Sequence, residues 1–270
     1  STDLDLSYNI GNKFLFKNTV SITQMNSKES PYGNFSDYVK MNPYYPMTDS
    51  AGKIVQVIDS WTDRSGAGGG IVTTPVLNPL YNATLGSFNK SDYLQLIDAF
   101  SADWTITRGL RLRGLISINQ TRSTTNDFVS PFANDFYFYG NDQLDQRGSY
   151  DYSDNIETVV AGSIPLNYNR KLGHHFINLV AGSNIHTDKG DYKSFSAVGF
   201  TNDKFSNIGF ANSYAPGSTP YGYISQQRLA GAFTSLNYSY NDIYLLDFTF
   251  REDGSSDFGS NKRVAPFNAL

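Results

Sequence analysis

The residues that could carry chemistry are few and scattered along the chain. The histidines are His174, His175 and His186, and no partner set at ligand spacing surrounds them as a zinc site would require. Glu252 and Asp253 are neighbours, and neighbouring strand residues point apart, so they do not form a catalytic pair. The sequence contains no enzyme signature and predicts no metal and no cofactor.

A glycine run at Gly68–Gly70 is the one segment that could suggest a phosphate-binding loop. It lacks the following Lys and Ser or Thr that such a loop uses to reach the phosphates and their metal ion. We interpret it as a flexible loop.

Aromatic-rich segments are stronger candidates for binding than any polar motif. Pro31–Pro46 and Pro131–Tyr139 both gather Tyr and Phe among turn residues. Flat amphipathic rings stack on a sugar or a peptide, although they could equally pack long loops against one another. The aromatic candidates for substrate or partner contact are Tyr44, Tyr45, Trp61, Tyr137 and Tyr139.

Period-2 alternation of apolar and polar residues recurs along the chain, whereas helical periodicity is hard to find. In Ile243–Arg251, for example, Tyr244, Leu246, Phe248 and Phe250 alternate with a mostly polar set, Leu245, Asp247, Thr249 and Arg251. Successive side chains of a strand point to opposite faces, so this pattern predicts a strand with one apolar face. Four pairs of such segments flank turn signals, which predicts four hairpins and about eight strands. The turns are Gly11-Asn12, Arg108-Gly109, Asn169–Gly173 and Asn241-Asp242.

The connections between the hairpins are long, running roughly over residues 25–92, 121–149 and 188–228. Soluble domains rarely carry such loops, and tight turns at one end with long loops at the other are typical of an outer-membrane β-barrel. Aromatic residues beside the tight turns favour a girdle at the lipid headgroups, although Tyr and Phe are also good strand residues. These aromatics include Tyr8, Phe14, Trp104, Tyr168, Phe176, Tyr238, Tyr240 and Tyr244.

Composition excludes several classes of protein. The 270 residues include 25 acidic and 21 basic side chains, so the chain lacks the basic excess that nucleic-acid binding requires. The absence of cysteine excludes a disulfide scaffold and thiolate zinc sites. No apolar run reaches the roughly 18 residues of a membrane helix.

The strand faces opposite the apolar ones carry charged residues. A soluble sandwich would place them in solvent, and a wide barrel would place them in a water-filled lumen. A lumen lined by arginines would favour acidic or hydroxyl-rich cargo. The candidates for this role are Arg111, Arg113 and Arg251.

Three separated motifs give the chain a specific family resemblance. Ser30–Tyr44 closely resembles a stretch of the SusC/RagA family of TonB-linked outer-membrane transporters, and Asn78–Ala83 resembles the same family. The third motif runs from Tyr244 to Arg251 and continues through Asp253–Ser256, Phe258-Gly259 and Arg263–Phe267.

The resemblance implies a barrel of about 22 strands, closed by a plug, in the outer membrane of a Gram-negative bacterium. Such a transporter imports oligosaccharides or peptides with energy from the TonB complex, which acts through the plug. The resemblance also implies a SusD-like surface lipoprotein as a lid, and contact with outer-membrane lipid.

The predicted fold is all-β: a segment of an antiparallel up-and-down transmembrane β-barrel with long extracellular loops. About eight strands cannot close so large a barrel, so residues 1–270 are expected to form one partial barrel region within a longer chain. The plug and the remaining strands lie outside it, and the chain is expected to stop at Leu270 where another strand should begin. Alone, it is expected neither to transport nor to fold stably in water, because two sheet edges would be exposed. The alternative is a soluble all-β carbohydrate-binding module.

Overall fold

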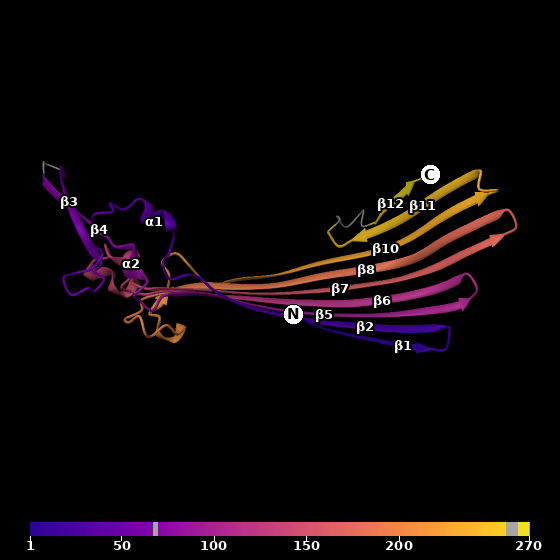
Figure 1. Ribbon diagram of the computed structural model, residues 1–270, viewed down its shortest axis with the longest axis horizontal. Coiled ribbons are helices and arrows are strands. Elements are labelled where there is room, and N and C mark those ends of the chain that lie inside the picture. The colour runs from indigo at the N-terminus through magenta and orange to yellow at the C-terminus, as the bar shows by residue number, and fades with distance from the viewer. Residues whose placement is uncertain (67–69, 258–263, 270) are drawn as a thin grey trace.

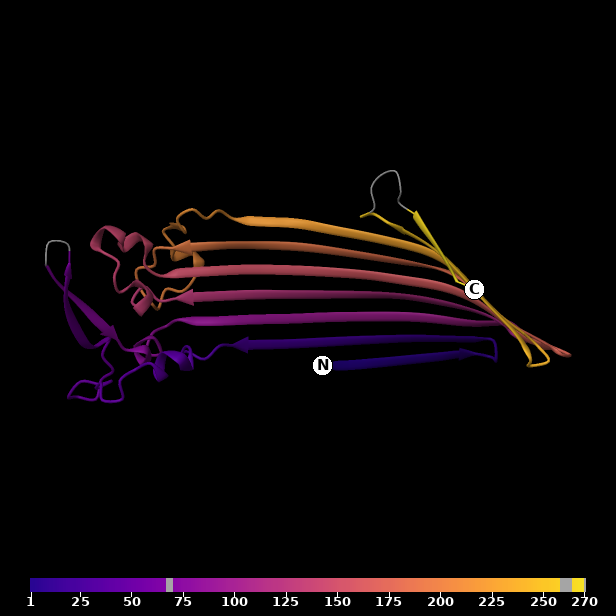
Figure 2. The ribbon, with the colours of Figure 1, turned by 90° about the horizontal axis from the view of Figure 1, so that it is seen from above.

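The computed structural model describes residues 1–66, 70–257 and 264–269. Gly68 and Gly69 of the glycine run, the Phe258-Gly259 motif, Arg263 and Leu270 lie outside these ranges. The described residues form one large curved sheet, with the long connections gathered at one end of its strands and the tight turns at the other (Figures 1 and 2).

The eight predicted strands are all present and form the four predicted hairpins. They are β1 (Thr2–Ile10), β2 (Phe14–Lys28), β5 (Phe88–Thr107), β6 (Leu110–Val129), β7 (Ser149–Leu172), β8 (His175–Val198), β10 (Tyr221–Tyr240) and β11 (Tyr244–Ser255). A further strand, β12 (Val264–Ala269), pairs with β11. The next strand was expected only at the end of the chain, at Leu270, so this expectation was wrong. Several strands also extend further toward the long connections than alternation had predicted.

The strands follow one another in sequence order across the sheet. The order is β1-β2-β5-β6-β7-β8-β10-β11-β12, every pairing is antiparallel, and the short β9 (Ser213–Tyr214) pairs with β8. This is the predicted up-and-down arrangement. Within the described ranges the sheet does not close, and its strands do not form the second packed layer of a sandwich, which is unlike the soluble module considered as the alternative.

The tight turns use residues that tolerate a left-handed backbone. Asn241 and Asp242 have φ of 55° and 57°, and the Ile243 N–H donates to the Tyr240 carbonyl at 3.1 Å, as in the type I′ turn that matches strand twist. Gly109 has φ of 88°, and a Cβ there would lie 2.3 Å from the Asn169 carbonyl oxygen. The hairpins therefore depend on the turn residues that predicted them.

The three long connections cover residues 29–87, 130–148 and 199–220. An unpredicted hairpin of β3 (Val57–Gly66) and β4 (Gly70–Leu77) forms a separate two-stranded sheet in the first connection (Figure 1). The short helical elements are α1 (Phe35–Val39), α2 (Pro79–Asn82), η1 (Asn134–Phe136), η2 (Asn141–Gln146) and η3 (Ile208–Phe210). Among the described residues, no helix has the length and apolar character needed to cross a bilayer.

The strand register separates the sheet into an apolar and a polar face, as alternation predicts. Phe14, Trp104, Leu112 and Leu166 are register partners across four strands, whereas Arg113 lies in the next row and points to the other side. The apolar side chains remain exposed to a large degree, with Ile116 at 49%, Ile164 at 56% and Ile185 at 54%. The apolar face is thus not covered by any other described part of the chain.

The apolar face is a band of limited height. Along β6 it runs from Leu110 to Ile118, and the next side chains on the same face are Gln120 and Arg122. This band is about nine residues long, close to the 9–11 residues of a membrane-spanning strand. Aromatic rings lie at its tight-turn end, where Phe14 stacks on Trp104 with ring centroids 5.6 Å apart.

The predicted girdle has one exception among its members. Phe176 is the register partner of Ser239, and Tyr238 and Tyr240 on either side of Ser239 belong to the apolar face. Phe176 therefore points to the polar face, and its place in the predicted girdle was wrong. Proximity to a turn led to the prediction, whereas strand parity decides the face.

The compact core of the chain lies where the ends of β6 and β8 meet the long connections. Phe128 and Phe200 are 0% and 2% exposed, and their rings meet edge to face at 5.1 Å. Ala133, Ala197 and Ser130 are buried beside them. This small core holds the connections against the ends of β6, β7 and β8.

Candidate functional site at the loop end of the sheet

The polar face ends, toward the long connections, in a row of hydroxyl side chains. The row crosses five neighbouring strands through Ser91, Thr125, Ser153, Ser194 and Tyr221. The Ser91 and Thr125 hydroxyl oxygens lie 3.3 Å apart. Because each hydroxyl can donate and accept hydrogen bonds, such a row can bind sugar hydroxyls or peptide groups.

Three tyrosines lie at one end of the hydroxyl row. Tyr192 is the register partner of Tyr223, with ring centroids 5.5 Å apart, and Tyr221 lies 5.9 Å from Tyr223 and 6.3 Å from Tyr192. Tyr221 and Tyr223 are 60% and 51% exposed, so their ring faces are available to a ligand. We call Tyr192, Tyr221 and Tyr223 the tyrosine cluster.

The sequence analysis missed the tyrosine cluster. Its signal was Tyr221-Gly222-Tyr223, because residues two apart on a strand share a face. The partner Tyr192 comes from a different hairpin, and only the register brings it into contact.

Carboxylates continue the polar face beyond the hydroxyl row. Asp127 and Asp151 are register partners, and the Asn89 side-chain amide donates to Asp127 at 3.2 Å. Burial raises the pKa of Asp127, as do the charges of Asp151 and Glu29, while the bond from Asn89 acts in the opposite direction. Asp127 lies well beyond the apolar band of β6, and it binds a proton more readily than an ordinary aspartate.

The space between this surface and the long connections is hollow. A cavity of about 630 Å³ is lined by Tyr32 and Lys40 of the first connection and by Asn89 and Asp127 of the wall. A second cavity of about 370 Å³ shares Asn89 and Asp127 and reaches Tyr192. Volumes of this size suit part of a chain-like ligand.

The aromatic candidates from the long connections lie at this same end of the sheet but divide by exposure. Tyr44 is 91% exposed and Trp61, on β3, is 54% exposed, whereas Tyr45 is half-buried. Tyr137 meets Phe138 at 5.2 Å, and Tyr139 meets Phe136 at 5.3 Å, both edge to face. Mutual packing thus describes part of the second aromatic segment, and contact with a ligand stays a prediction for all five candidates.

The arginine candidates lie on the polar face near the tight turns, far from the tyrosine cluster. Arg113 forms a bidentate pair with Asp103, at 2.8 and 3.1 Å, and Arg251 pairs with Asp253 at 2.5 Å. Arg111 and Arg113 line a cavity of about 590 Å³. The structure therefore does not bring the arginine and the aromatic candidates into one site.

His174 and His175 lie at a tight turn, whereas His186 lies within β8. The His175 Nδ1 lies 2.7 Å from the Tyr238 hydroxyl, and the His175 ring lies 5.0 Å from that of Tyr240. In the described part of the chain, no group of three or more His, Asp or Glu residues is arranged to hold a metal ion.

Solved structures with a similar fold are known. The chain superposes on the RagAB peptide transporter with a TM-score of 0.74, 21% identity, and coverage of 98% of this chain and 29% of that one. The RagAB peptide importer in its open-open state gives the same TM-score and identity over 28% of its chain. No protein-family profile matches the chain.

Relatives from Formosa agariphila point to the same class. TonB-dependent receptor P3 is 29% identical over 102 residues, which are 38% of this chain and 10% of the receptor. TonB-dependent receptor P26 is 25% identical over 198 residues, which are 72% of this chain and 19% of the receptor. The chain is a SusC/RagA-like segment in fold, and its sequence is similar to TonB-dependent receptors.

The SusC/RagA-like segment spans less than a third of each of these relatives. Its class belongs to the outer membrane of Gram-negative bacteria, which assigns the apolar band to lipid and the opposite face to the lumen. Tight turns of outer-membrane barrels face the periplasm and long loops face outward. The tyrosine cluster and the carboxylates therefore line the outer mouth of the SusC/RagA-like barrel.

Proposed function

We propose that residues 1–270 form one region of the wall and outer mouth of a TonB-dependent importer that takes up oligosaccharides or peptides. The observation that carries the proposal is the two-faced sheet. One face is an apolar band of membrane height, and the other is lined by hydroxyl, amide and carboxylate side chains that continue to an outer mouth.

The long connections support a role in capture. They form an ordered cluster around Phe128 and Phe200, and their exposed aromatics include Tyr44 and Trp61. We propose that a SusD-like surface lipoprotein covers this cluster and that the cargo first meets both proteins. The TonB complex acts on a plug supplied by the rest of the transporter.

The tyrosine cluster provides the sharpest test of cargo contact. In cells that express the full-length transporter, we expect Tyr221→Ala with Tyr223→Ala to reduce uptake of labelled oligosaccharide or peptide severalfold, because stacked rings contribute to binding. Ile243→Ala, in a tight turn at the other end of the sheet, is the matched control and should leave uptake unchanged.

Two further arms make the test decisive. Deletion of the TonB motor should abolish uptake by the wild-type protein, and purification of the transporter should recover a surface lipoprotein in stoichiometric amount. The proposal would be contradicted if uptake stayed unchanged both after deletion of the TonB motor and in the tyrosine variant.

A further inference from the structure

The outward face of the sheet changes character above the apolar band. On β6 the side chains beyond Ile118 on that face are Gln120, Arg122 and Thr124, and on β8 those beyond Ile185 include Lys189, Asp191 and Lys193. These polar residues occupy the same face as the lipid-facing ones, so the lumen does not account for them.

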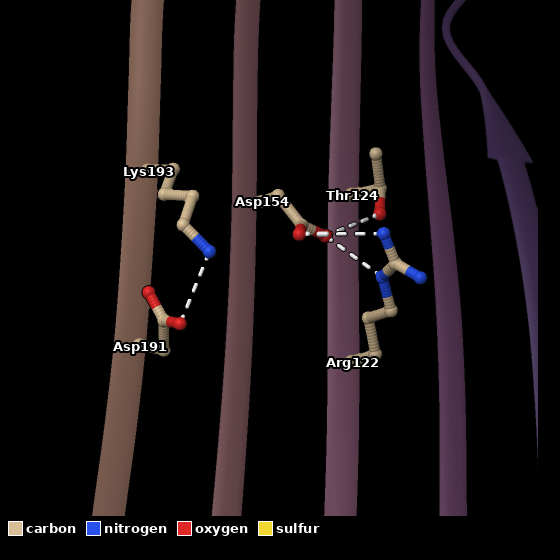
Figure 3. Close-up of polar contacts among 5 residues, drawn as sticks. All are labelled: Arg122, Thr124, Asp154, Asp191 and Lys193. Carbon is tan, nitrogen blue, oxygen red and sulfur yellow. Dashed lines mark hydrogen bonds and ion pairs between the residues drawn. The ribbon is translucent and has the colours of Figure 1, made fainter. Parts of the chain in front are cut away.

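Figure 3 shows how the charged side chains of this outward patch are arranged. Arg122 donates to both carboxylate oxygens of Asp154, at 2.9 and 3.3 Å, and Thr124 donates to the same carboxylate at 3.0 Å. Lys193 donates to Asp191 at 3.0 Å. The two pairs lie on β6, β7 and β8, so they occupy one continuous part of the wall.

The cations of the patch are outermost. The side chains of Arg122 and Lys193 are 54% and 62% exposed, while those of their partners Asp154 and Asp191 are 9% and 31% exposed. The less exposed carboxylates therefore orient the more exposed cations, and the outward face of the wall presents positive charge here. Lys189, also exposed on this face, adds another positive charge.

The depth of the patch places it at the lipid headgroups. Arg122 lies four residues beyond Ile118, which is about 13 Å along an extended strand and less along the membrane normal, because barrel strands are tilted. Neighbouring strands are about 4.8 Å apart, and Lys193 lies two strands across and two residues along from Arg122, so their backbones are separated by about 12 Å. One phosphorylated headgroup can span that separation.

We propose that Arg122, Lys189 and Lys193 bind the phosphate groups of a glycolipid in the outer leaflet of the outer membrane. The patch is continuous with the lipid-facing band, and its exposed cations complement a phosphorylated headgroup. The acyl chains of the same lipid then lie along the apolar band below.

The test uses full-length transporter purified from outer membranes, with lipid binding measured by native mass spectrometry. The probes are diphosphorylated lipid A and the same lipid without phosphates. Lys189→Gln with Lys193→Gln should weaken binding of phosphorylated lipid A by about fivefold for each lysine replaced. Lys53→Gln, in an exposed loop away from the wall, is the matched charge control and should bind as the wild type does.

A second variant guards against an effect on folding. Arg122→Gln with Asp154→Asn removes the exposed cation together with its buried partner, so it leaves no unpaired buried carboxylate, and it should also weaken binding severalfold. Both variants must keep the heat-modifiable gel shift of a folded barrel.

Four results would overturn the proposal. The first is that both folded variants bind phosphorylated lipid A as tightly as the wild type does. The second is that the wild-type protein binds the lipid without phosphates as tightly as it binds phosphorylated lipid A. The third is displacement of lipid A by inorganic phosphate, which would assign the patch to a free anion. A changed oligomeric state with unchanged lipid binding would assign the surface to a protein contact and would likewise contradict the proposal.

Discussion

Asn78 is the residue on which the arrangement of the long connections most depends. It is 0% exposed, and its side-chain amide donates to the carbonyls of Met47 and Val55, at 2.9 and 2.8 Å. Its side-chain oxygen caps α2 by accepting from the Leu80 N–H at 3.1 Å, and its own carbonyl accepts from Asn134. Its side chain thus joins three segments of the first connection, and its backbone carbonyl links them to the second.

Replacing Asn78 by alanine should loosen the outer mouth. The Val55 carbonyl would lose this donor, and the Met47 carbonyl would keep only the bond from the Val55 N–H, at a combined cost of about 1–3 kcal/mol. Limited proteolysis of the full-length transporter should cleave the first connection faster in Asn78→Ala than in the wild type. Asn42→Ala, at an exposed position, should cleave at the wild-type rate, and equal rates for all three proteins would contradict the anchoring role.

Asp127 predicts a pH dependence at the same end of the sheet. Its pKa is raised in the folded protein, so the folded state binds the proton more readily than the unfolded chain does. Local stability should therefore rise as the pH falls through the raised pKa toward the ordinary range of aspartate. Hydrogen-exchange protection in residues 130–148, taken relative to the intrinsic rate at each pH, should rise on mild acidification.

The control for this pH effect is Asp127→Asn. Without the titrating group, protection at the loop end should already be high at neutral pH and should lose much of its pH dependence. If Asp127→Asn keeps the full pH dependence of the wild-type protection, the effect belongs to another titrating group.

At the scale of the elements, each strand has two zones. The zone near the tight turns alternates cleanly between apolar and polar residues, and this zone is what predicted the eight strands. Beyond it, β6 carries Arg122 and β8 carries Lys193 on the face that is apolar below. Alternation disappears there, which is why the sequence predicted strands that were too short at this end.

Long-range register explains most of what the sequence could not predict about the elements. The tyrosine cluster joins β8 to β10, and the β3–β4 hairpin depends on a pairing with two register irregularities. The arginines were correctly placed on the face opposite the apolar one, because parity within a strand is local information. Their separation from the loop aromatics depends on position along the strands, which parity does not give.

A matched pair of substitutions on β6 tests the assignment of its faces. Arginine in place of Ile116 would sit in the lipid band, where a basic residue near the midplane costs about 2–4 kcal/mol. Ser117→Arg puts the same side chain on the lumenal face and should cost much less. The fraction of full-length protein assembled in liposomes should fall for the first variant only, and equal losses would contradict the two faces.

At the scale of the whole molecule, the chain is a wall whose packed core lies at one end. The sheet keeps its apolar face exposed over the membrane band, and the buried residues gather around Phe128 among the long connections. A chain built this way relies on lipid for the stability that a soluble domain obtains from its core. This arrangement accounts for the low charge content of a sequence without apolar helices, since the apolar band carries few charged side chains, Asp98 among them.

The most direct test of this account measures both faces at once in the assembled, full-length transporter. Spin labels are attached to single cysteines in neighbouring pairs on three strands, and collision with oxygen and with a water-soluble nickel complex is recorded in lipid vesicles. The pairs are Phe16 and Lys17, Ile116 and Ser117, and Ile185 and His186. The account predicts that the first label of every pair is accessible to oxygen in lipid and the second to the nickel complex. Equal accessibility of both labels in each pair to the nickel complex would contradict it.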